Sequence, residues 1–278
     1  MDWGWGALST ERDTKFARLE AWLKDAGSVL VAFSGGVDST YLAAMTYKAL
    51  GDRALAVTAD SPSIPRSDLQ GAGELAKQIG IRHRVIEAKE MENPDYVRNE
   101  PDRCYHCKAE LFGLLEKIAK EEDFAVVVDG ANAEDIGDYR PGSRAARERG
   151  VRSPLQELGF TKEDVRAGSR GLGLPTADRP ASACLASRVP YGTGISVETL
   201  RMIESAEAGL REMGFAVVRV RAHGDVARLE FSPKDIPRAM ESELRQRIAE
   251  HVRACGFRYV AVDLEGYRTG SLNEGLRR

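Results

Sequence analysis

Residues 34–40, with the sequence SGGVDST, have the types and spacing needed to hold a phosphate group. The two glycines allow a sharp turn and a close approach of the backbone to a ligand. Ser34, Ser39 and Thr40 add hydroxyl donors, and a helix that begins after the glycines would direct its first N–H groups at an anion. The carboxylate of Asp38 would repel phosphate unless a cation lies between them, so this residue is a candidate catalytic ligand of Mg²⁺.

The segment lacks the Gly-Lys-Ser/Thr ending of a Walker loop. It resembles the PP-loop of the ATP pyrophosphatases, although an ordinary Ser-Gly-Gly turn is the alternative. The resemblance implies that the chain attaches AMP to a carboxylate or carbonyl oxygen and releases pyrophosphate. In such enzymes the segment after the second strand, here residues 58–63, runs alongside the adenine of ATP. The residues expected to bind ATP are Ser34, Gly35, Gly36, Asp38, Ser39, Thr40, Thr58, Ser63 and Gly130.

Three of the four cysteines suggest a further chemistry. Cys104 and Cys107 form a Cys-Tyr-His-Cys sequence at the predicted start of a helix, and Cys184 lies in a basic segment. Positive charge from Arg179 and Arg188 would favour the thiolate of Cys184, which we interpret as a catalytic nucleophile, and an ordinary cysteine in a basic loop is the alternative. Three interpretations of Cys104 and Cys107 stay open: a redox pair, an iron–sulfur cluster completed by Cys184, or no function.

Short apolar runs alternate with helical patterns in the first half of the chain. Such runs are typical of strands buried on both faces, and their alternation with helices predicts an α/β fold with a doubly wound parallel sheet. Ligands bind beyond the carboxyl ends of such strands. The predicted strands are residues 28–33, 53–59, 82–87 and 125–128. Residues 130–195, rich in Gly, Pro and Arg, are expected to be irregular.

The pattern changes near residue 190 and predicts a small α+β domain. Its expected helices are residues 197–213 and 235–254, and its expected strands are residues 216–222, 226–231 and 258–263. We therefore predict a PP-loop ATP pyrophosphatase domain at residues 1–190 and a small α+β, substrate-binding domain at residues 191–278.

One face of the predicted hairpin in the small domain is charged. Alternation along a strand places Arg219 and Arg221 on the same face, and Glu230 of the partner strand lies on the matching face. Guanidinium groups bind phosphate and carboxylate through paired hydrogen bonds. We interpret this face as a substrate site, and a solvated strand face is the alternative.

Charge and composition limit the partners. The net charge of −3 offers no basic field to hold nucleic acid, so no nucleic-acid partner is expected. The first residues do not resemble a signal peptide, and no apolar stretch approaches the roughly 18 residues that cross a bilayer. We expect a cytoplasmic protein with reduced cysteines and no membrane contact. Cys255, late in a predicted helix, is expected to be structural.

Several segments together resemble the LarE family, the ATP-dependent sulfur transferases of nickel-pincer cofactor assembly. The resemblance runs from about residue 10 to the C-terminus, and its most specific mark is ACLASR at residues 183–188. The other segments are residues 34–40, 103–108, 129–135, 138–142, 154–155, 190–192, 266–268 and 270–271.

The resemblance implies a nucleotide-like small-molecule substrate, a pyridinium mononucleotide that bears two carboxylates. ATP adenylates one carboxylate and sulfur replaces the AMP, so that two rounds give the bis-thiocarboxylate. The resemblance also implies ATP and Mg²⁺ as cofactors, and self-association of the small domain into a hexamer. The residues expected to bind this substrate are Ser187, Arg188, Arg219, Arg221 and Glu230.

Two branches of the family differ in the source of the sulfur. In one branch, a cysteine at the position of Cys184 gives up its sulfur and becomes dehydroalanine. In the other, three cysteines hold a [4Fe–4S] cluster that carries the sulfur. Cys104, Cys107 and Cys184 match the three-cysteine set, so we favour the cluster branch while keeping the sacrificial cysteine as the alternative.

Other functions fit parts of the sequence. A tRNA thiolase can combine a PP-loop with three cysteines, but the net charge and the lack of an appended RNA-binding domain count against it. An ammonia-dependent PP-loop amide ligase usually needs a glutaminase, for which the chain has no room. A regulatory nucleotide-binding protein would not require three cysteines around the expected pocket.

Overall fold

The computed structural model describes residues 10–137, 141–180 and 182–268, which form two compact units. The first unit comprises the described residues within Met1–Ser61, Arg66–Glu90 and Cys104–Ser182, and the second those within Pro62–Pro65, Met91–Arg103 and Ala183–Arg278. The motif residues 138–140 and 270–271 lie outside the described residues. The predicted division into domains at residue 190 stays a prediction.

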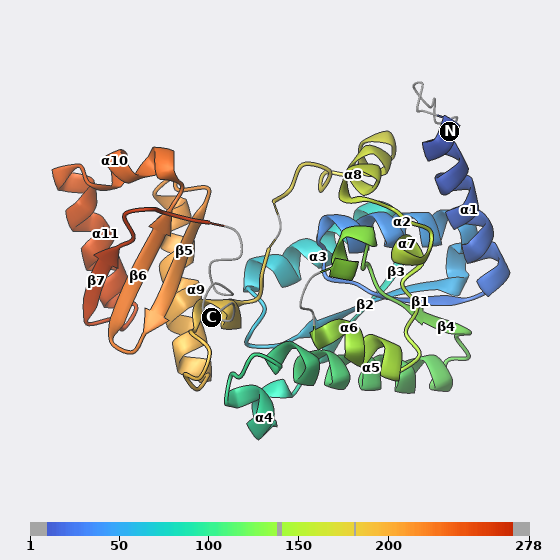
Figure 1. The fold of residues 1–278 in the computed structure, drawn as a ribbon, viewed down its shortest axis with the longest axis horizontal. Helices are drawn as coiled ribbons and strands as arrows, with labels where there is room; N and C mark the ends of the chain where they lie inside the picture. The colour runs from blue at the N-terminus through green and yellow to red at the C-terminus, as the bar shows by residue number, and fades with distance from the viewer. Residues whose placement is uncertain (1–9, 138–140, 181, 269–278) are drawn as a thin grey trace. The chain divides into compact units, whose positions relative to one another are not determined.

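The first unit contains a four-stranded parallel sheet (Figure 1). Its strands are β1 (Val29–Ala32), β2 (Ala54–Asp60), β3 (Arg82–Glu87) and β4 (Val126–Val128). Their order in the sheet is β3-β2-β1-β4. Because β1 has β2 on one side and β4 on the other, the winding reverses at β1, and the carboxyl ends of β1 and β4 flank the expected ligand position. The predicted α/β fold is confirmed.

Helices cover both faces of this sheet. They are α1 (Thr10–Ala26), α2 (Val37–Leu50), α3 (Arg66–Ile79), α5 (Arg103–Glu121), α6 (Pro141–Glu148), α7 (Pro154–Glu157) and α8 (Lys162–Gly171). Figure 1 shows α5 and α6 on one face of the sheet and α1 and α2 on the other.

The two-residue period of the strands divides the core between these faces. Val29 and Val31 belong to the apolar cluster that contains Leu19 of α1. Leu30, which lies between them in β1, belongs to a second cluster with Phe112 of α5. The continuous apolar run in β1 is therefore explained by burial on both sides.

Residues 130–195 are more regular than predicted, because they contain α6, α7 and α8. A capping box begins α8: the Thr161 hydroxyl accepts from the Asp164 amide, and the Asp164 carboxylate accepts from the Thr161 amide. The expectation of an irregular region was wrong. Helices of one to three turns give a weak periodic signal, and tertiary packing rather than propensity stabilises them.

The second unit contains a mixed three-stranded sheet in the order β5-β6-β7. Its strands are β5 (Val218–His223), β6 (Val226–Phe231) and β7 (Tyr259–Val262), with β5 and β6 antiparallel and β6 and β7 parallel. Its helices are α4 (Pro94–Val97), α9 (Val197–Glu212), α10 (Ile236–Ala239), α11 (Ser242–Ala254) and the short 3₁₀-helix η4 (Leu185–Arg188). The predicted small α+β fold is confirmed. Among the described residues, no helix is long and apolar enough to span a membrane.

Asp164 joins α8 to α1 in the first unit. Its carboxylate is 7% exposed and pairs with Lys15 Nζ at 2.9 Å and with Arg12 Nε at 3.1 Å. Burial alone would raise the pKa of this carboxyl group, but hydrogen bonds from Lys15 and Thr161 hold the pKa below its usual value.

We expect Asp164→Asn to lower the free energy of unfolding by about 1–3 kcal/mol at neutral pH, because two partly buried donors, Arg12 and Lys15, lose a charged acceptor. A carboxyl group with a depressed folded pKa stabilises the fold above its unfolded pKa of about 3.9, and this contribution is lost as the pH falls through the folded pKa. Urea unfolding at several pH values measures this effect. The difference between wild type and variant should be largest at pH 7 and shrink below about pH 4; a difference that is constant down to pH 2 would contradict the assignment.

Candidate functional site

The phosphate loop connects β1 to α2. Gly35 has a positive φ of 70°, and a Cβ at this position would lie 3.2 Å from both Cα and Cβ of Ala72 in α3. Gly36 is extended and caps α2 without a side-chain hydrogen bond. The loop therefore turns tightly against α3, and within the described part of the chain no side-chain hydrogen bond caps the N-terminus of α2.

Serine hydroxyls fix the loop to the first turn of α2. Ser34 Oγ and Ser39 Oγ lie 3.0 Å apart, and the Gly36 amide donates to Ser34 Oγ at 3.3 Å. Ser39 Oγ also lies 3.2 Å from the Gly36 carbonyl oxygen. The Thr40 side chain is fully buried, and within the described residues its hydroxyl has no hydrogen-bond partner. The structure brings the predicted loop residues together, and their contacts with ATP stay predictions.

Gly130 closes the site from the side of β4. A Cβ on Gly130 would lie 2.8 Å from the Ser39 amide nitrogen and 3.1 Å from Ser39 Cα. The segment that follows β4 therefore passes directly against the first turn of α2. Only glycine permits this approach, since a real Cβ does not tolerate such distances.

A lysine that the sequence did not point to pairs with Asp38. Lys162 Nζ lies 2.5 Å from Asp38 Oδ2, and Asn132 Nδ2 donates to Asp38 Oδ1 at 3.3 Å. Lys162 is the first residue of α8, and its amide donates to Glu134 at 2.9 Å. The capping box at Thr161 is a local signal that would have located the start of this helix, but not its position beside residue 38.

Arg179 also contacts the phosphate loop. Its Nη1 donates to the Gly35 carbonyl at 3.4 Å, and its Nη2 pairs with Asp68 of α3 at 2.7 Å. The sequence interpretation grouped Arg179 with Cys184. The observed contacts of Arg179 instead link the loop to α3, which carries both Asp68 and Ala72.

Thr58 and Ser63, both expected near the adenine, are buried. The Thr58 hydroxyl donates to the Phe33 carbonyl at 2.8 Å and therefore accepts from His83 Nε2, also at 2.8 Å. Burial lowers the pKa of His83, which favours this neutral arrangement. Ser63 belongs to the second unit, where its carbonyl accepts from the Leu185 amide at 2.7 Å. The adenine contacts of Thr58 and Ser63 stay predictions.

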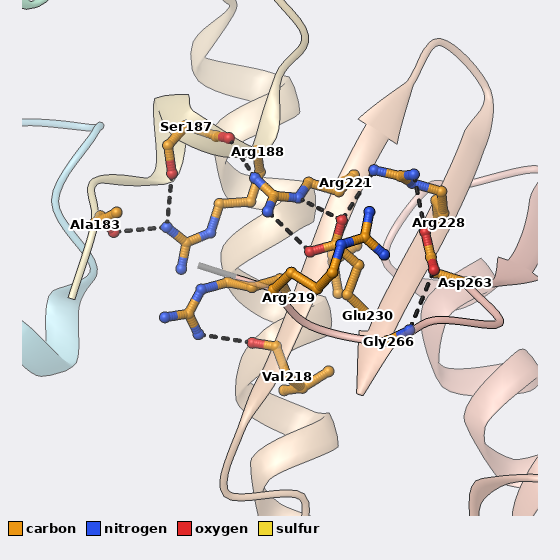
Figure 2. A network of polar contacts seen from close by, with 12 residues as sticks. Ala183, Ser187, Arg188, Val218, Arg219, Arg221, Arg228, Glu230, Asp263 and Gly266 are labelled. Carbon is orange, nitrogen blue, oxygen red and sulfur yellow. Dashed lines mark hydrogen bonds and ion pairs between the residues drawn. The ribbon is translucent and has the colours of Figure 1, made fainter. Parts of the chain in front are cut away.

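In the second unit, Arg221 and Glu230 form a buried bidentate ion pair. Arg221 Nε and Nη2 donate to the two carboxylate oxygens at 3.0 and 2.8 Å. Arg221 Nη1 also donates to the Ser187 carbonyl at 2.7 Å (Figure 2). Arg228 shares Glu230 and pairs with Asp263. The predicted polar face exists, but Arg221 and Glu230 are engaged with each other.

Arg188 is the most enclosed of the predicted substrate residues, with 1% of its surface exposed. Its Nε and Nη2 donate to the Glu207 carboxylate at 2.9 and 3.0 Å. Burial would raise the pKa of Glu207, but Arg188 and then Arg211 keep it low. All three nitrogens of Arg188 thus have protein acceptors, and its contact with substrate stays a prediction.

Arg219 differs from the other two arginines. It stacks over the Tyr267 ring at 5.0 Å from the centroid and donates to the Val218 carbonyl, and no carboxylate of the described residues pairs with it. Burial and then the neighbouring charge of Arg188 lower the pKa of Arg219. A guanidinium among like charges favours an incoming anion, so Arg219 is the strongest of the predicted substrate contacts.

Comparison of the sequence with those of known proteins identifies the family of the chain. Residues 11–100 match the NAD synthase family model. The chain is 43% identical to an uncharacterized protein of Synechocystis sp. over 96% of this chain and 99% of the relative. It is 38% identical to pyridinium-3,5-bisthiocarboxylic acid mononucleotide synthase of Lactiplantibacillus plantarum, over 95% and 96% of the two chains. The chain belongs to the LarE family. One chain of the glutamine-hydrolyzing GMP synthase of Methanococcus vannielii is 30% identical over 68% of this chain and 62% of its own length.

Membership of the LarE family and the PP-loop domain establish the class of enzyme. The chain is an ATP-dependent adenylating sulfurtransferase. The phosphate loop in the first unit has amide and hydroxyl donors between β1 and α2, where ligands of such sheets bind, and its role in holding ATP stays a prediction.

The cysteines expected from the LarE resemblance lie in both units. Cys104 and Cys107 lie near the start of α5 in the first unit, and Cys184 caps η4 in the second. Among the described residues, no group of three or more His, Cys, Asp or Glu side chains is placed to hold a metal ion. The iron–sulfur site therefore stays a prediction. Burial raises the pKa of the Cys255 thiol, as expected for a structural cysteine.

We expect Gly130→Ala to weaken ATP binding by about tenfold or more, equivalent to about 1.4 kcal/mol, because the added methyl group would displace the first turn of α2. Gly73→Ala is the matched control, since an added Cβ there meets no atom within 4 Å. Titration calorimetry with ATP measures both variants. Equal ATP affinities for Gly130→Ala and the control would show that the close approach is unimportant for the nucleotide site.

Proposed function

We propose that the chain adenylates the carboxylates of a pyridinium dicarboxylate mononucleotide and converts them to thiocarboxylates for the nickel-pincer cofactor. The similarity to the Lactiplantibacillus plantarum synthase over nearly the whole of both chains carries this proposal. The match to the Methanococcus vannielii GMP synthase chain covers a smaller share of each sequence and supports the adenylating part alone.

Adenylation is assigned to the first unit. The substrate carboxylate attacks the α-phosphorus of ATP, the bond to the β-phosphate oxygen breaks, and pyrophosphate leaves. The loop residues 34–40 hold the phosphates, and Lys162, which pairs with Asp38 beside this loop, is the candidate cation that balances part of their charge. Asp38 suits Mg²⁺, which commonly binds one or two carboxylates together with phosphate oxygens, and bound Mg²⁺ would neutralise phosphate charge.

Sulfur transfer is assigned to Cys184. Its thiolate attacks the carbon of the acyl adenylate, the bond to AMP breaks, and a thioester forms. Loss of the Cα proton of Cys184 and cleavage of its Cβ–S bond then release the thiocarboxylate and leave dehydroalanine. This sacrificial route is the alternative to the cluster branch that the cysteine count favours, in which a [4Fe–4S] cluster held by Cys104, Cys107 and Cys184 would carry the sulfur instead.

The substrate's anionic groups need fixed cations, and Arg219 supplies one without a carboxylate partner among the described residues. Ser187, Arg188, Arg221 and Glu230 complete the proposed substrate set. The small domain at residues 191–278 is also proposed to build a hexamer, and the enzyme is proposed to act in the cytoplasm without nucleic-acid or membrane partners.

Cys184→Ala should still release pyrophosphate from ATP in the presence of the dicarboxylate, at a rate within about twofold of wild type, because the phosphate loop lies in the other unit. It should form no thiocarboxylate, because the sulfur nucleophile or carrier is missing. Pyrophosphate assay and mass spectrometry of the product measure the two steps. Cys255→Ala is the control and should perform both. Thiocarboxylate made by Cys184→Ala would remove this residue from the chemistry.

Iron and acid-labile sulfide, measured on protein purified without oxygen, decide between the two sulfur sources. About four of each per chain, lost on substitution of Cys104 or Cys107, would identify the cluster. Without iron, the intact mass after reaction should fall by the mass of H₂S at Cys184. A catalytic protein that shows neither iron nor mass loss would contradict both sulfur sources.

A further inference from the structure

Buried arginines hold the backbone of the segment that carries Cys184. Arg188 Nη1 donates to the carbonyls of Ala183 and Cys184 at 2.6 and 2.9 Å. Arg221 Nη1 donates to the carbonyl of Ser187 at 2.7 Å. Figure 2 shows the Arg188 guanidinium folding back from η4 onto this segment and the Arg221 guanidinium reaching it from β5.

A third guanidinium reaches the same segment from outside the polar network already described. Arg103 Nη1 donates to the Ala186 carbonyl at 2.9 Å, and Arg103 is 2% exposed. Four carbonyl groups of the short segment 183–187 therefore accept hydrogen bonds from cationic donors. Such charge-assisted bonds are stronger than those between neutral groups, so this backbone is held more firmly than an ordinary loop.

Each guanidinium is fixed by an acceptor on another element. Glu207 of α9 binds Arg188, and Glu230 of β6 binds Arg221. Arg103 is bound by the side-chain oxygen of Asn99. Buried ion pairs and buried guanidinium groups add little net stability compared with apolar side chains of similar volume. We therefore interpret the guanidinium groups around residues 183–187 as fixing the conformation of this backbone rather than as raising the stability of the fold.

Asn99 fixes the position of Arg103, the third arginine that holds the segment. Asn99 is fully buried and has a positive φ of 58°, a conformation that asparagine tolerates better than most residues. Its amide group donates to the Pro190 and Thr193 carbonyls at 2.8 and 2.9 Å, and its own carbonyl accepts from the Gly192 amide. Asn99 therefore joins Arg103 to the turn that follows the Cys184 segment.

We propose that Arg103, fixed by Asn99, is a positioning residue for Cys184. It acts through the Ala186 carbonyl and holds the 183–187 backbone in the conformation that directs the sulfur at the acyl carbon. The inference rests on the proposed role of Cys184 in sulfur transfer and adds the residues that make this role effective. A loss of alignment of about 1 Å costs up to about a hundredfold in rate, so the removal of one anchor should be measurable.

Arg103→Met, which keeps most of the side-chain volume, should slow thiocarboxylate formation by at least about tenfold in single turnover. Pyrophosphate release should stay within about twofold, because the phosphate loop lies in the other unit. Arg103→Lys should recover part of the rate through its remaining cationic donor. Arg98→Met is the matched control: its side chain is 65% exposed and pairs with Asp95, and both steps should be unchanged.

Two further measurements separate positioning from general damage. Arg103→Ala should regain sulfur transfer when methylguanidinium is added, whereas a misfolded protein would not. Asn99→Gly keeps a backbone that tolerates positive φ and removes the amide, and it should slow sulfur transfer by about three- to tenfold with pyrophosphate release intact.

Several results would overturn the inference: sulfur transfer at the wild-type rate in Arg103→Met or Asn99→Gly, equal losses in both steps, or no rescue by methylguanidinium. A wild-type protein that releases pyrophosphate but makes no thiocarboxylate would refute the proposed function instead. The two failures are therefore distinguishable.

Discussion

The segment after β4 and the first turn of α2 approach so closely that no side chain fits between them. The contact of Gly130 with the Ser39 backbone sets this distance, and the strand order that places β4 beside β1 makes it unavoidable. Asn132, two residues after Gly130, donates to the Asp38 carboxylate, and Lys162 pairs with the same carboxylate. A phosphate site made of backbone N–H groups requires such an arrangement, since every added side chain would separate the ligand from the donors.

In the second unit, charged side chains rather than close backbone packing hold the segment that carries Cys184. Cys184 lies in a segment too short to have a rigid fold of its own, and cationic side chains hold its carbonyl groups instead. Arg188 and Arg221 are paired with Glu207 and Glu230, and Arg103 is bound by the Asn99 side chain, whereas Arg219 has no carboxylate ion pair among the described residues. Arginine therefore holds the backbone at three positions, and at a fourth, Arg219, it stays the predicted contact for an anionic ligand.

Local patterns predicted much of this molecule. The apolar runs located all four parallel strands, and the SGGVDST sequence located the phosphate loop, because both signals lie within a few neighbouring residues. Lys162 was missed because 124 positions separate it from Asp38. The protein partners of the arginines could not be predicted for the same reason: alternation along β5 correctly grouped Arg219 with Arg221, but only the fold decides which guanidinium is bound by a carboxylate of the chain. Short helices between residues 141 and 171 were missed because packing stabilises them.

The chain passes between the two units repeatedly, since residues 62–65 and 91–103 belong with the C-terminal unit although they lie within the sequence of the first. A single cut of the backbone therefore cannot yield a complete C-terminal unit, which would lack Ser63, Asn99 and Arg103. Because the C-terminal unit is not encoded by one continuous stretch of sequence, it cannot be exchanged between genes as a single segment. Gene fusion or exchange at one junction would divide this unit, so the two units are constrained to be inherited together.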